Sequence, residues 1–432
     1  MKDLHVMASN ARKAFYEISA SSHDARNQVL LKLVQLLQEN SLSIFEENKT
    51  DMVAAEKEGL AAPLLHRLAF GEEKLNQTVQ GLLALAKLED PINKTLLSTE
   101  ITDGLKMYKV SSPIGVVGVI FESRPDALIQ IASLCIKSGN AVLLKGGREA
   151  LHTNKILCSL IRQSLSACAL PPDAAQLLET REEVSEMLKE DTCIELIIPR
   201  GSNQFVRYIM DNSRIPVLGH SDGICHVYVD ETIDMSTALR VAVDSKVQNV
   251  SVCNAVETLL VHQNIAAEFL PRLYEELSAR HVEIRGDQSV RKLIPCVEAT
   301  EEDWSTEYLD YILSIKIVSS LKEAIDHINS YGSHHTDCII TENKENASEF
   351  MNKVDSSGVY WNVSTRFSDG FVYGFGAEVG IATGKLHARG PMGLEGLTTY
   401  KYKLLGSGQI MDDMKKKKQL YTHRSMKEDC PL

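Results

Sequence analysis

Residues 244–262 read DSKVQNVSVCNAVETLLVH. A polar segment passes through Cys253 and Asn254 into an apolar run at 256–261, which predicts a buried strand. The mouth of such an element suits a nucleophile, because a thiolate there can meet substrate and backbone N–H groups, such as that of Asn254, can hold an oxyanion. Cysteine is also a common small buried hydrophobe, so the stretch alone leaves both interpretations open.

Strand and helix patterns alternate on both sides of this stretch. Before it, strands are predicted at 114–121, 141–145 and 194–199, with a further strand beginning at 217–218, and helices at 125–138, 149–168 and 202–212. Strands at 224–229 and 255–262 and a helix at 265–277 repeat the alternation, and the first ninety residues show helical periodicity at 27–40, 63–68 and 72–88. This order predicts an α/β protein with parallel sheets covered by helices on both faces, and a boundary near Gly223.

Length and composition narrow the function classes. A chain of 432 residues is expected to form two or three domains. The net charge of -12 argues against nucleic-acid binding. No signal peptide or membrane span is expected from the apolar runs. Nine scattered cysteines without a CxxC pair predict reduced thiols in the cytoplasm, and the ligand spacing predicts no metal site.

Two junctions are candidates for binding a dinucleotide, although no GxGxxG fingerprint follows a strand. Residues 142–148 read VLLKGGR, a strand that ends in a cation and two glycines, where α/β sheets bind ligands. Residues 198–203 read IPRGSN and join a strand to a helix, so N–H groups of Gly201 and Ser202 could hold a pyrophosphate. A surface role for Arg148 and a simple helix cap at Ser202 are the alternatives.

The region around Cys253 resembles the catalytic-cysteine region of the gamma-glutamyl phosphate reductases, the proline-biosynthesis branch of the aldehyde dehydrogenase superfamily. The resemblance runs in order from about residue 8 to about residue 408, and is densest at 112–147, 191–230, 244–262 and 356–403. It implies an aldehyde-dehydrogenase-like fold with a parallel-sheet cofactor-binding domain at 1–98 and 112–222 and a parallel-sheet catalytic domain at 223–388. Segments 99–111 and 389–410 would pair in a small oligomerisation sheet. Independently of the resemblance, the lysine run at 415–418 makes residues 411–432 typical of a basic, disordered and solvated tail.

The resemblance implies NADPH-dependent reduction of L-glutamyl 5-phosphate to L-glutamate 5-semialdehyde. Cys253 would carry the glutamyl group as a thioester after phosphate leaves. Hydrolytic aldehyde dehydrogenases use a glutamate base to activate the water that cleaves the thioester. Residues 216–220 here read PVLGH and contain no carboxylate. Loss of that base suits an enzyme that must keep water from a thioester.

The resemblance also assigns cofactor contacts. Lys145 matches the lysine that contacts the adenosine ribose, and Glu307 matches the glutamate that holds the nicotinamide ribose. Arg148 replaces a glutamate found in many NAD-dependent relatives, which favours NADP(H) because a guanidinium suits a 2′-phosphate. The full predicted cofactor set is Lys145, Gly147, Arg148, Arg200, Gly201, Ser202 and Glu307.

For the substrate, Arg124 stands where hydrolytic relatives place an asparagine, and is expected to hold the departing phosphate. Capping or pairing at a helix start is the alternative for this residue. Residues 361–367 read WNVSTRF and resemble the substrate loop of the family, with Arg366 as the carboxylate clamp. The predicted substrate-binding set is His220, Asn249, Asn362, Ser364, Thr365 and Arg366.

Two rival functions share these features: a CoA-acylating aldehyde dehydrogenase, and a non-catalytic scaffold with the same fold. The resemblance implies a homo-oligomer, dimer or tetramer, with small-molecule substrates. Because the chain begins directly with the reductase-like region, glutamyl phosphate is expected from a separate glutamate 5-kinase, with which transient contact is a hypothesis.

Overall fold

The computed structural model describes residues 3–122, 124–180, 182–220, 222–375, 378–416 and 420–432. The chain divides into two compact units. Unit 1 contains Met1–Leu218, Phe375–Gly380 and Met392–Leu432, and unit 2 contains Gly219–Gly374 and Ile381–Pro391. The change of unit after Leu218 lies a few residues before the predicted boundary at Gly223.

Unit 1 is built on a four-stranded parallel sheet in the order β5-β4-β3-β6. Its strands are β3 (Val116–Phe121), β4 (Ala141–Lys145), β5 (Ala175–Leu178) and β6 (Leu196–Arg200). Every residue of β3 and β4 is buried, as expected for parallel strands covered on both faces. The predicted strand at 217–218 is reduced to a single bridge between Val217 and Ile197.

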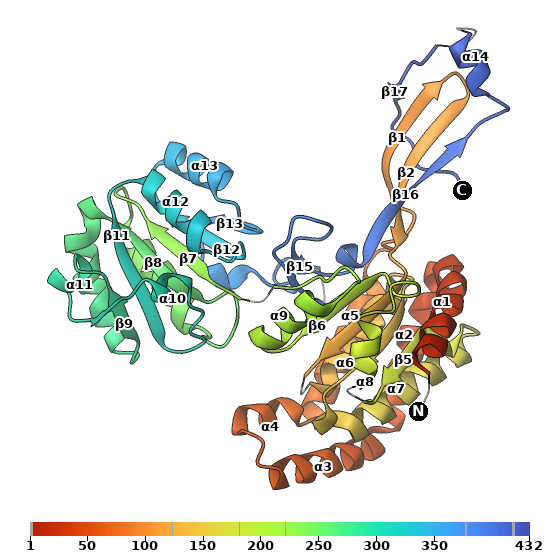
Figure 1. Ribbon diagram of the computed structural model, residues 1–432, viewed down its shortest axis with the longest axis horizontal. Helices are drawn as coiled ribbons and strands as arrows, with labels where there is room; N and C mark the ends of the chain where they lie inside the picture. Colours follow the sequence, from red (N-terminus) through yellow and green to blue (C-terminus); the bar gives the residue numbers. More distant parts are fainter. Residues whose placement is uncertain (1–2, 123, 181, 221, 376–377, 417–419) are drawn as a thin grey trace. The chain divides into compact units, whose positions relative to one another are not determined.

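Helices surround this sheet (Figure 1). They are α1 (Leu4–Ala20), α2 (His23–Glu39), α3 (Ser41–Lys57), α4 (Ala62–Leu68), α5 (Glu72–Lys87), α6 (Pro125–Lys137), α7 (Leu151–Ala167), α8 (Glu182–Met187) and α9 (Asn203–Asn212). Helices α1 and α6 both contact β3 and β4, and α2 contacts α5 and α7. The helical predictions for the first ninety residues are confirmed.

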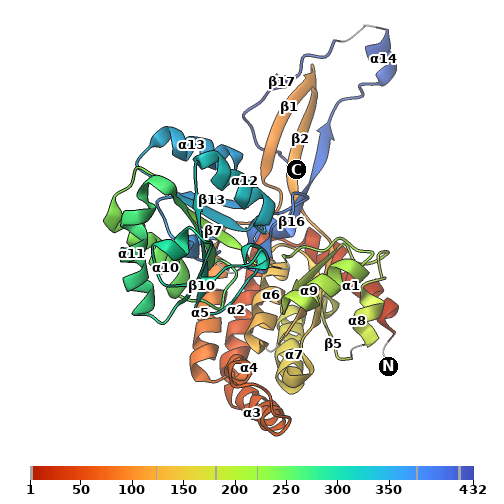
Figure 2. The ribbon, with the colours of Figure 1, turned by 60° about the vertical axis from the view of Figure 1, so that its left-hand side comes forward.

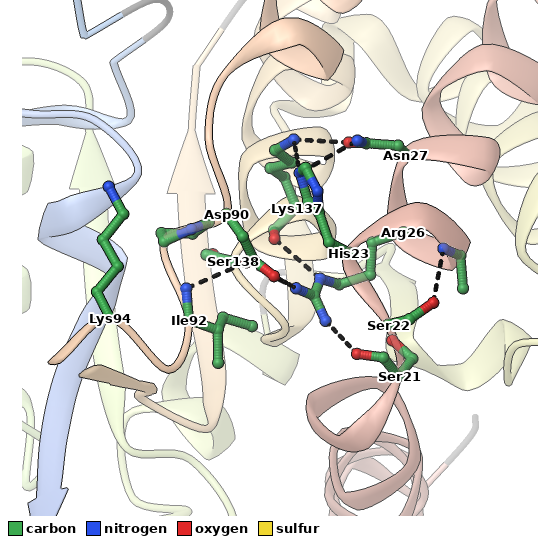
Figure 3. A network of polar contacts seen from close by, with 12 residues as sticks. Ser21, Ser22, His23, Arg26, Asn27, Asp90, Ile92, Lys94, Lys137 and Ser138 are labelled. Atoms are coloured by element: carbon green, nitrogen blue, oxygen red, sulfur yellow. Dashed lines mark hydrogen bonds and ion pairs between the residues drawn. The ribbon is translucent and has the colours of Figure 1, made fainter. Parts of the chain in front are cut away.

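A buried polar network joins α2, α6 and the segment after α5 (Figure 3). Arg26 donates to both carboxylate oxygens of Asp90 at 2.8 Å and to the carbonyl of Lys137 at 3.1 Å. Lys137 Nζ lies 2.6 Å from Asn27 Oδ1 and 2.7 Å from His23 Nε2. Burial lowers the pKa of Lys137 to about 8. The network fixes α2 against the end of α6 and the segment after α5, and so orients the helical layer on the sheet.

Unit 1 also carries a four-stranded sheet in the order β16-β2-β1-β17. Its strands are β1 (Thr95–Thr102), β2 (Leu105–Pro113), β16 (Thr398–Leu405) and β17 (Arg424–Ser425), with α14 (Met411–Lys415) drawn near one end in Figure 1. Antiparallel pairing of β2 with β16 confirms the predicted association of these segments.

The end of the chain is ordered against this sheet, contrary to the expected disordered tail. β17 pairs with β1, and the Glu428 carboxylate accepts from the Tyr108 hydroxyl at 2.5 Å and from Lys106 at 2.8 Å. Two of the four consecutive lysines, Lys417 and Lys418, lie outside the described residues. A charge run at 415–418 therefore did not predict the behaviour of the residues that follow it.

Unit 2 contains a seven-stranded parallel sheet in the order β10-β9-β11-β8-β7-β12-β13, seen with its helices in Figure 2. The strands are β7 (Cys225–Val229), β8 (Val256–His262), β9 (Glu283–Gly286), β10 (Val297–Glu298), β11 (Ile312–Val318), β12 (Thr336–Ile340) and β13 (Gly358–Trp361). The helices are α10 (Met235–Val247), α11 (Gln263–Ser278), α12 (Leu321–Tyr331) and α13 (Lys344–Lys353). Short strands β14 (Gly380–Ala382) and β15 (Gly390–Met392) form a separate pair.

The core of unit 2 lies between its sheet and α10 and α11. Leu259, Val261, Phe269 and Leu273 are buried there, and each contributes about 1.5–3 kcal/mol by leaving water. This core fixes β8, and with β8 the residues that precede it. Among the described residues, no helix combines the length and apolarity needed to cross a bilayer.

Candidate active site

Cys253 lies in the turn between α10 and β8, and its side chain is half-buried. Gly223, which precedes β7, permits a close approach to this turn: a Cβ at Gly223 would lie 2.5 Å from both Cα and Cβ of Cys253. The thiol of Cys225 donates to the Cys253 carbonyl at 3.3 Å. Burial raises the pKa of Cys225 well above its usual value, so this second thiol stays protonated and serves packing.

The nearest titratable partner of Cys253 is His335, whose Nε2 lies 3.2 Å from the cysteine Sγ. His335 is fully buried, and its Nδ1 lies 3.0 Å from the Thr336 hydroxyl. His335 precedes β12, Gly223 precedes β7 and Cys253 precedes β8, and these three strands are neighbours in the sheet. Because parallel strands begin at one edge, the fold brings the three residues together there.

His220, one of the predicted substrate-binding residues, lies in this cluster. Its ring meets the His335 ring edge-on, with centroids 5.1 Å apart. Its Nδ1 lies 2.9 Å from the Ile381 carbonyl, which can only accept, so Nδ1 carries the proton. The Nε2 lone pair of His220 is therefore available to another group.

The loop after β13 is bonded to the cysteine turn. Thr365 Oγ1 donates to the Asn254 carbonyl at 2.7 Å, and Asn254 Nδ2 donates to the Ser368 carbonyl at 2.9 Å. Ser245 on α10 accepts from the Thr365 N–H at 3.2 Å and donates to Ser364 Oγ at 3.3 Å. Asn254, Ser364 and Thr365 are buried, so this geometry positions the turn by locking the loop to it.

Arg366 is half-buried and donates from Nε to Gln248 Oε1 at 2.8 Å. Burial lowers its pKa, while the nearby Cys253 and Asp244 act in the opposite direction. A guanidinium held beside the cysteine can attract an anionic ligand. Of the predicted substrate residues, His220 lies in the cluster with Cys253, and Arg366 is close enough to Cys253 for the cysteine to affect its pKa.

Asn249 and Asn362 make local contacts instead. Asn249 is exposed and accepts from the Ser251 N–H at 3.1 Å. Asn362 adopts a left-handed backbone conformation, φ 55°, and both ends of its amide bond the backbone of Thr341 at 2.9 Å. It shares with Ser364 and Asp244 the wall of a hollow of about 800 Å³ that Cys253 does not line.

Behind the cysteine turn, Lys246 and Glu257 form a fully buried ion pair at 2.5 Å. Burial raises the pKa of Glu257 to about 7, against the opposing effect of Lys246, and burial lowers the pKa of Lys246. Glu307, the predicted ribose contact, is half-buried and close enough to Glu257 to raise the pKa of that carboxyl further. Sequence reasoning missed this pair, which links α10 to β8.

The remaining predicted cofactor residues lie in unit 1, at the carboxyl ends of β4 and β6. Lys145 is buried at the end of β4, and its Nζ donates to the Gly146 carbonyl at 2.5 Å. Gly147 follows, and the carboxylate of Glu149 lies beside it. Arg148 is exposed and forms a surface ion pair with Glu58 at 2.9 Å.

At the end of β6, Arg200 donates to the Glu378 carbonyl at 3.3 Å, and Ser202 is the N-cap residue of α9. The Ser202 N–H donates to the Glu122 carboxylate at 3.1 Å, and a Cβ at Gly201 would lie 2.6 Å from the same carboxylate. A pyrophosphate at this N–H would have to displace Glu122.

Arg124 is the N-cap residue of α6, and its side chain makes no capping bond. Partial desolvation, followed by the nearby Arg200 and Arg67, lowers its pKa. The guanidinium groups of Arg200 and Arg67 thus lie near that of Arg124, and the Asp126 carboxylate opposes their effect on its pKa. Such a concentration of positive charge favours an anion.

His335 and Gly223 are the site residues that sequence reasoning did not find. A usable signal was present, because residues 333–337 read SHHTD and lead into a buried strand. Nothing in the sequence, however, indicated that this segment would meet Cys253, from which His335 is separated by 82 positions.

Comparison with known proteins agrees with this architecture. The profile of the aldehyde dehydrogenase family matches residues 1–310. A gamma-glutamyl phosphate reductase of Acetivibrio thermocellus is 56% identical over 426 residues and covers 99% of each chain. Gamma-glutamyl phosphate reductase 1 of Synechocystis is 53% identical over 407 residues, 94% of each chain.

Solved structures give the same result. The crystal structure of a gamma-glutamyl phosphate reductase from Thermotoga maritima superposes with a TM-score of 0.93 at 40% identity, over 95% of this chain and 100% of that one. A propionaldehyde dehydrogenase from Rhodopseudomonas palustris, with bound CoA and an acylated cysteine, reaches 0.64 at 14% identity over 93% of this chain and 97% of that one. The second likeness is one of fold alone.

Proposed function

This chain belongs to the aldehyde dehydrogenase family, and on that premise we propose that it reduces L-glutamyl 5-phosphate to L-glutamate 5-semialdehyde with release of phosphate. The observation that carries the proposal is the half-buried Cys253 thiol with the His335 imidazole at 3.2 Å. Similarity over the full length to gamma-glutamyl phosphate reductases is the basis for the proposed substrate.

The proposed chemistry begins with a proton transfer. The Cys253 thiol gives its proton to Nε2 of His335, and the thiolate attacks the acyl carbon of the substrate. The bond between that carbon and the phosphate oxygen breaks, and a cysteinyl thioester forms as phosphate leaves. Arg366 is proposed to hold the substrate carboxylate, because its guanidinium lies near the cysteine.

Arg124 is proposed to bind the departing phosphate. The support is the positive charge that Arg124 shares with Arg200 and Arg67. A dianionic leaving group is stabilised most by cations that are already in place before it forms.

NADPH, when bound, would supply the hydride that reduces the thioester to the aldehyde and frees the Cys253 sulfur. Lys145 and Arg148 are the cations proposed to contact its ribose and 2′-phosphate. Arg148 fits this role because it is exposed and its partner Glu58 is a surface carboxylate that a phosphate can displace.

The test is a spectrophotometric assay of NADP reduction with pyrroline-5-carboxylate, which equilibrates with the semialdehyde, in the presence and absence of inorganic phosphate. Phosphate-dependent turnover is expected, and Cys253→Ala is expected to abolish it while the protein stays folded. Turnover without phosphate, or more than a few per cent of activity in Cys253→Ala, would refute the proposal.

A CoA-acylating dehydrogenase is the second candidate, because solved CoA-dependent enzymes share the fold. Replacing phosphate by CoA in the same assay separates the two functions. A non-catalytic scaffold would show neither activity.

The compartment, the oligomeric state and a partner protein are also part of the proposal. Nine free cysteines support a reducing compartment such as the cytoplasm. Exposed Tyr400 and Leu404 on the edge strand β16 support a homo-oligomer formed through this sheet. Because glutamyl phosphate is labile and must reach the enzyme quickly, transient contact with a glutamate 5-kinase is also proposed.

A further inference from the structure

Three side chains with metal-ligating atoms meet at the cysteine turn. His220, Cys253 and His335 each offer one nitrogen or sulfur atom, and these atoms lie within 4.8 Å of one another. A tetrahedral zinc ion, with bonds of about 2.0–2.3 Å to nitrogen and sulfur, needs its ligand atoms about 3.4–3.6 Å apart. One pair, His335 Nε2 and Cys253 Sγ, is already at 3.2 Å.

In each histidine, the ring nitrogen Nδ1 has a hydrogen-bond partner outside the cluster, as is usual for metal-ligating histidines. Nδ1 of His220 donates to the Ile381 carbonyl at 2.9 Å, which leaves its Nε2 as the lone-pair donor. Nδ1 of His335 lies 3.0 Å from Thr336 Oγ1, and its Nε2 points at the cysteine sulfur. The Ile381 carbonyl holds the neutral His220 ring in the tautomer that leaves Nε2 for a metal, and the Thr336 hydroxyl can do the same for His335 by accepting from its Nδ1.

The geometry points to a zinc site formed by His220, Cys253 and His335, with the fourth position open to water or to another ligand. On binding, the Cys253 thiol loses its proton to solvent and the sulfur becomes a zinc thiolate, with no change in oxidation state. Two imidazoles and a thiolate form a ligand set that suits Zn²⁺. The sequence spacing gave no sign of this site, because its ligands come from three separate segments.

Zinc at this position would switch the enzyme off. A metal-bound sulfur cannot attack an acyl phosphate, and His335 cannot take a proton while its Nε2 is a ligand. This consequence rests on the proposed function of Cys253, whereas the binding of zinc itself does not. The bound ion would also shield the thiol from oxidants and alkylating agents until a chelator or a competing ligand removes it.

A second set of ligands provides a matched control. His5, Glu190 and Cys193 in unit 1 also place their ligand atoms within 4.8 Å. There the Glu190 carboxylate is already bonded to His5 at 3.1 Å and to the Thr192 hydroxyl, and His5 is exposed. Variants His5→Ala and Cys193→Ser therefore remove similar ligands from a site outside the catalytic unit.

The test titrates the metal-free full-length protein with Co²⁺, which reports thiolate ligation by a charge-transfer band and tetrahedral geometry by its visible bands. Zn²⁺ is then added to displace it, and the alkylation rate of Cys253 is followed by peptide mass spectrometry. Wild type is expected to bind one Co²⁺ with a thiolate band, and Zn²⁺ is expected to slow alkylation at least about tenfold.

His220→Ala and Cys253→Ser are expected to lose the thiolate band, as is His335→Gln, which keeps most of the buried volume. His5→Ala and Cys193→Ser are expected to retain it, and thermal melting checks that each variant is folded. Absence of the band in wild type, or its survival in His220→Ala, would overturn the zinc site. Zinc binding in an enzyme whose Cys253→Ala variant still turns over would instead overturn the proposed function and leave the site standing.

Discussion

Nε2 of His335 lies 3.2 Å from Sγ of Cys253, although 82 positions separate the two residues in the chain. The contact exists because the strands that follow the two residues flank β7 in one parallel sheet. His335 is buried while Cys253 is half-buried, so the imidazole supports the thiol from the protein interior. The predictions below follow from this arrangement and from the groups that hold it.

Replacing His335 with Ala is expected to lower turnover by about 10²–10⁴, the usual contribution of a positioned acid–base group. The alkylation rate of Cys253 at fixed pH should fall with it, because less thiolate is present. His334→Asn is the matched control, since His334 bonds the Asp355 carbonyl and its φ of 60° suits asparagine. Equal losses in both variants would show that the effect is structural.

Substituting Gly223 by Ala should disable the site without touching a reactive group. The added Cβ would lie 2.5 Å from Cα and Cβ of Cys253, so the turn must move. A loss of stability of about 1–3 kcal/mol is expected, with a larger loss of turnover. Gly384→Ala serves as the control, because nothing lies within 4 Å of its Cβ position. Denaturant unfolding and the coupled assay measure both effects, and an active Gly223→Ala enzyme would contradict the close approach.

Lys246→Met should make stability depend on pH through Glu257. Removing Lys246 removes an effect that lowers the pKa of Glu257, so this pKa should rise above about 7. A carboxyl whose pKa is raised by folding contributes stability at low pH that is lost as pH rises through the folded pKa. The stability gap to wild type should therefore be small near about pH 6 and grow toward about pH 8.5, by up to about 1.4 kcal/mol per pH unit.

The double variant Lys246→Met/Glu257→Gln is the control for this experiment, because it has no titrating group at the site. Its unfolding free energy should not show the fall with rising pH that the single variant shows, because neither side chain at this position titrates. A pH-independent gap for the single variant would mean that Glu257 does not titrate as described.

Arg148→Glu is expected to weaken NADP binding by about 10- to 100-fold, the loss of a charge-assisted contact to phosphate, without weakening NAD. The measurement is the ratio of kcat/KM for the two cofactors. Lys155→Glu on α7 changes the net charge equally and breaks a similar surface ion pair, with Glu179. An unchanged ratio in Arg148→Glu, or an equal change in Lys155→Glu, would remove Arg148 from the 2′-phosphate site.

Much of the secondary structure could be predicted, because it follows from local patterns of apolar and polar residues. Residues 141–145 form β4 with the predicted bounds, since an unbroken apolar run between turns suits a strand covered on both faces. The cysteine turn before β8 was also predicted, because the change from polar to apolar residues is local. α10 was missed, because its buried face includes the polar residues Ser245 and Lys246, which interrupt the apolar pattern of the helix.

The sequence by itself determined several helices of the first ninety residues, much of the alternation of strands and helices between residues 114 and 277, and which cysteine stands at the start of a buried strand. Only the tertiary structure decided that His220, Gly223 and His335 surround that cysteine. It also decided that Lys246 and Glu257 form a buried ion pair behind the cysteine turn, and that the end of the chain joins a sheet. Secondary structure follows from neighbours along the chain, whereas these contacts depend on strand order, which is settled by packing between segments far apart in sequence.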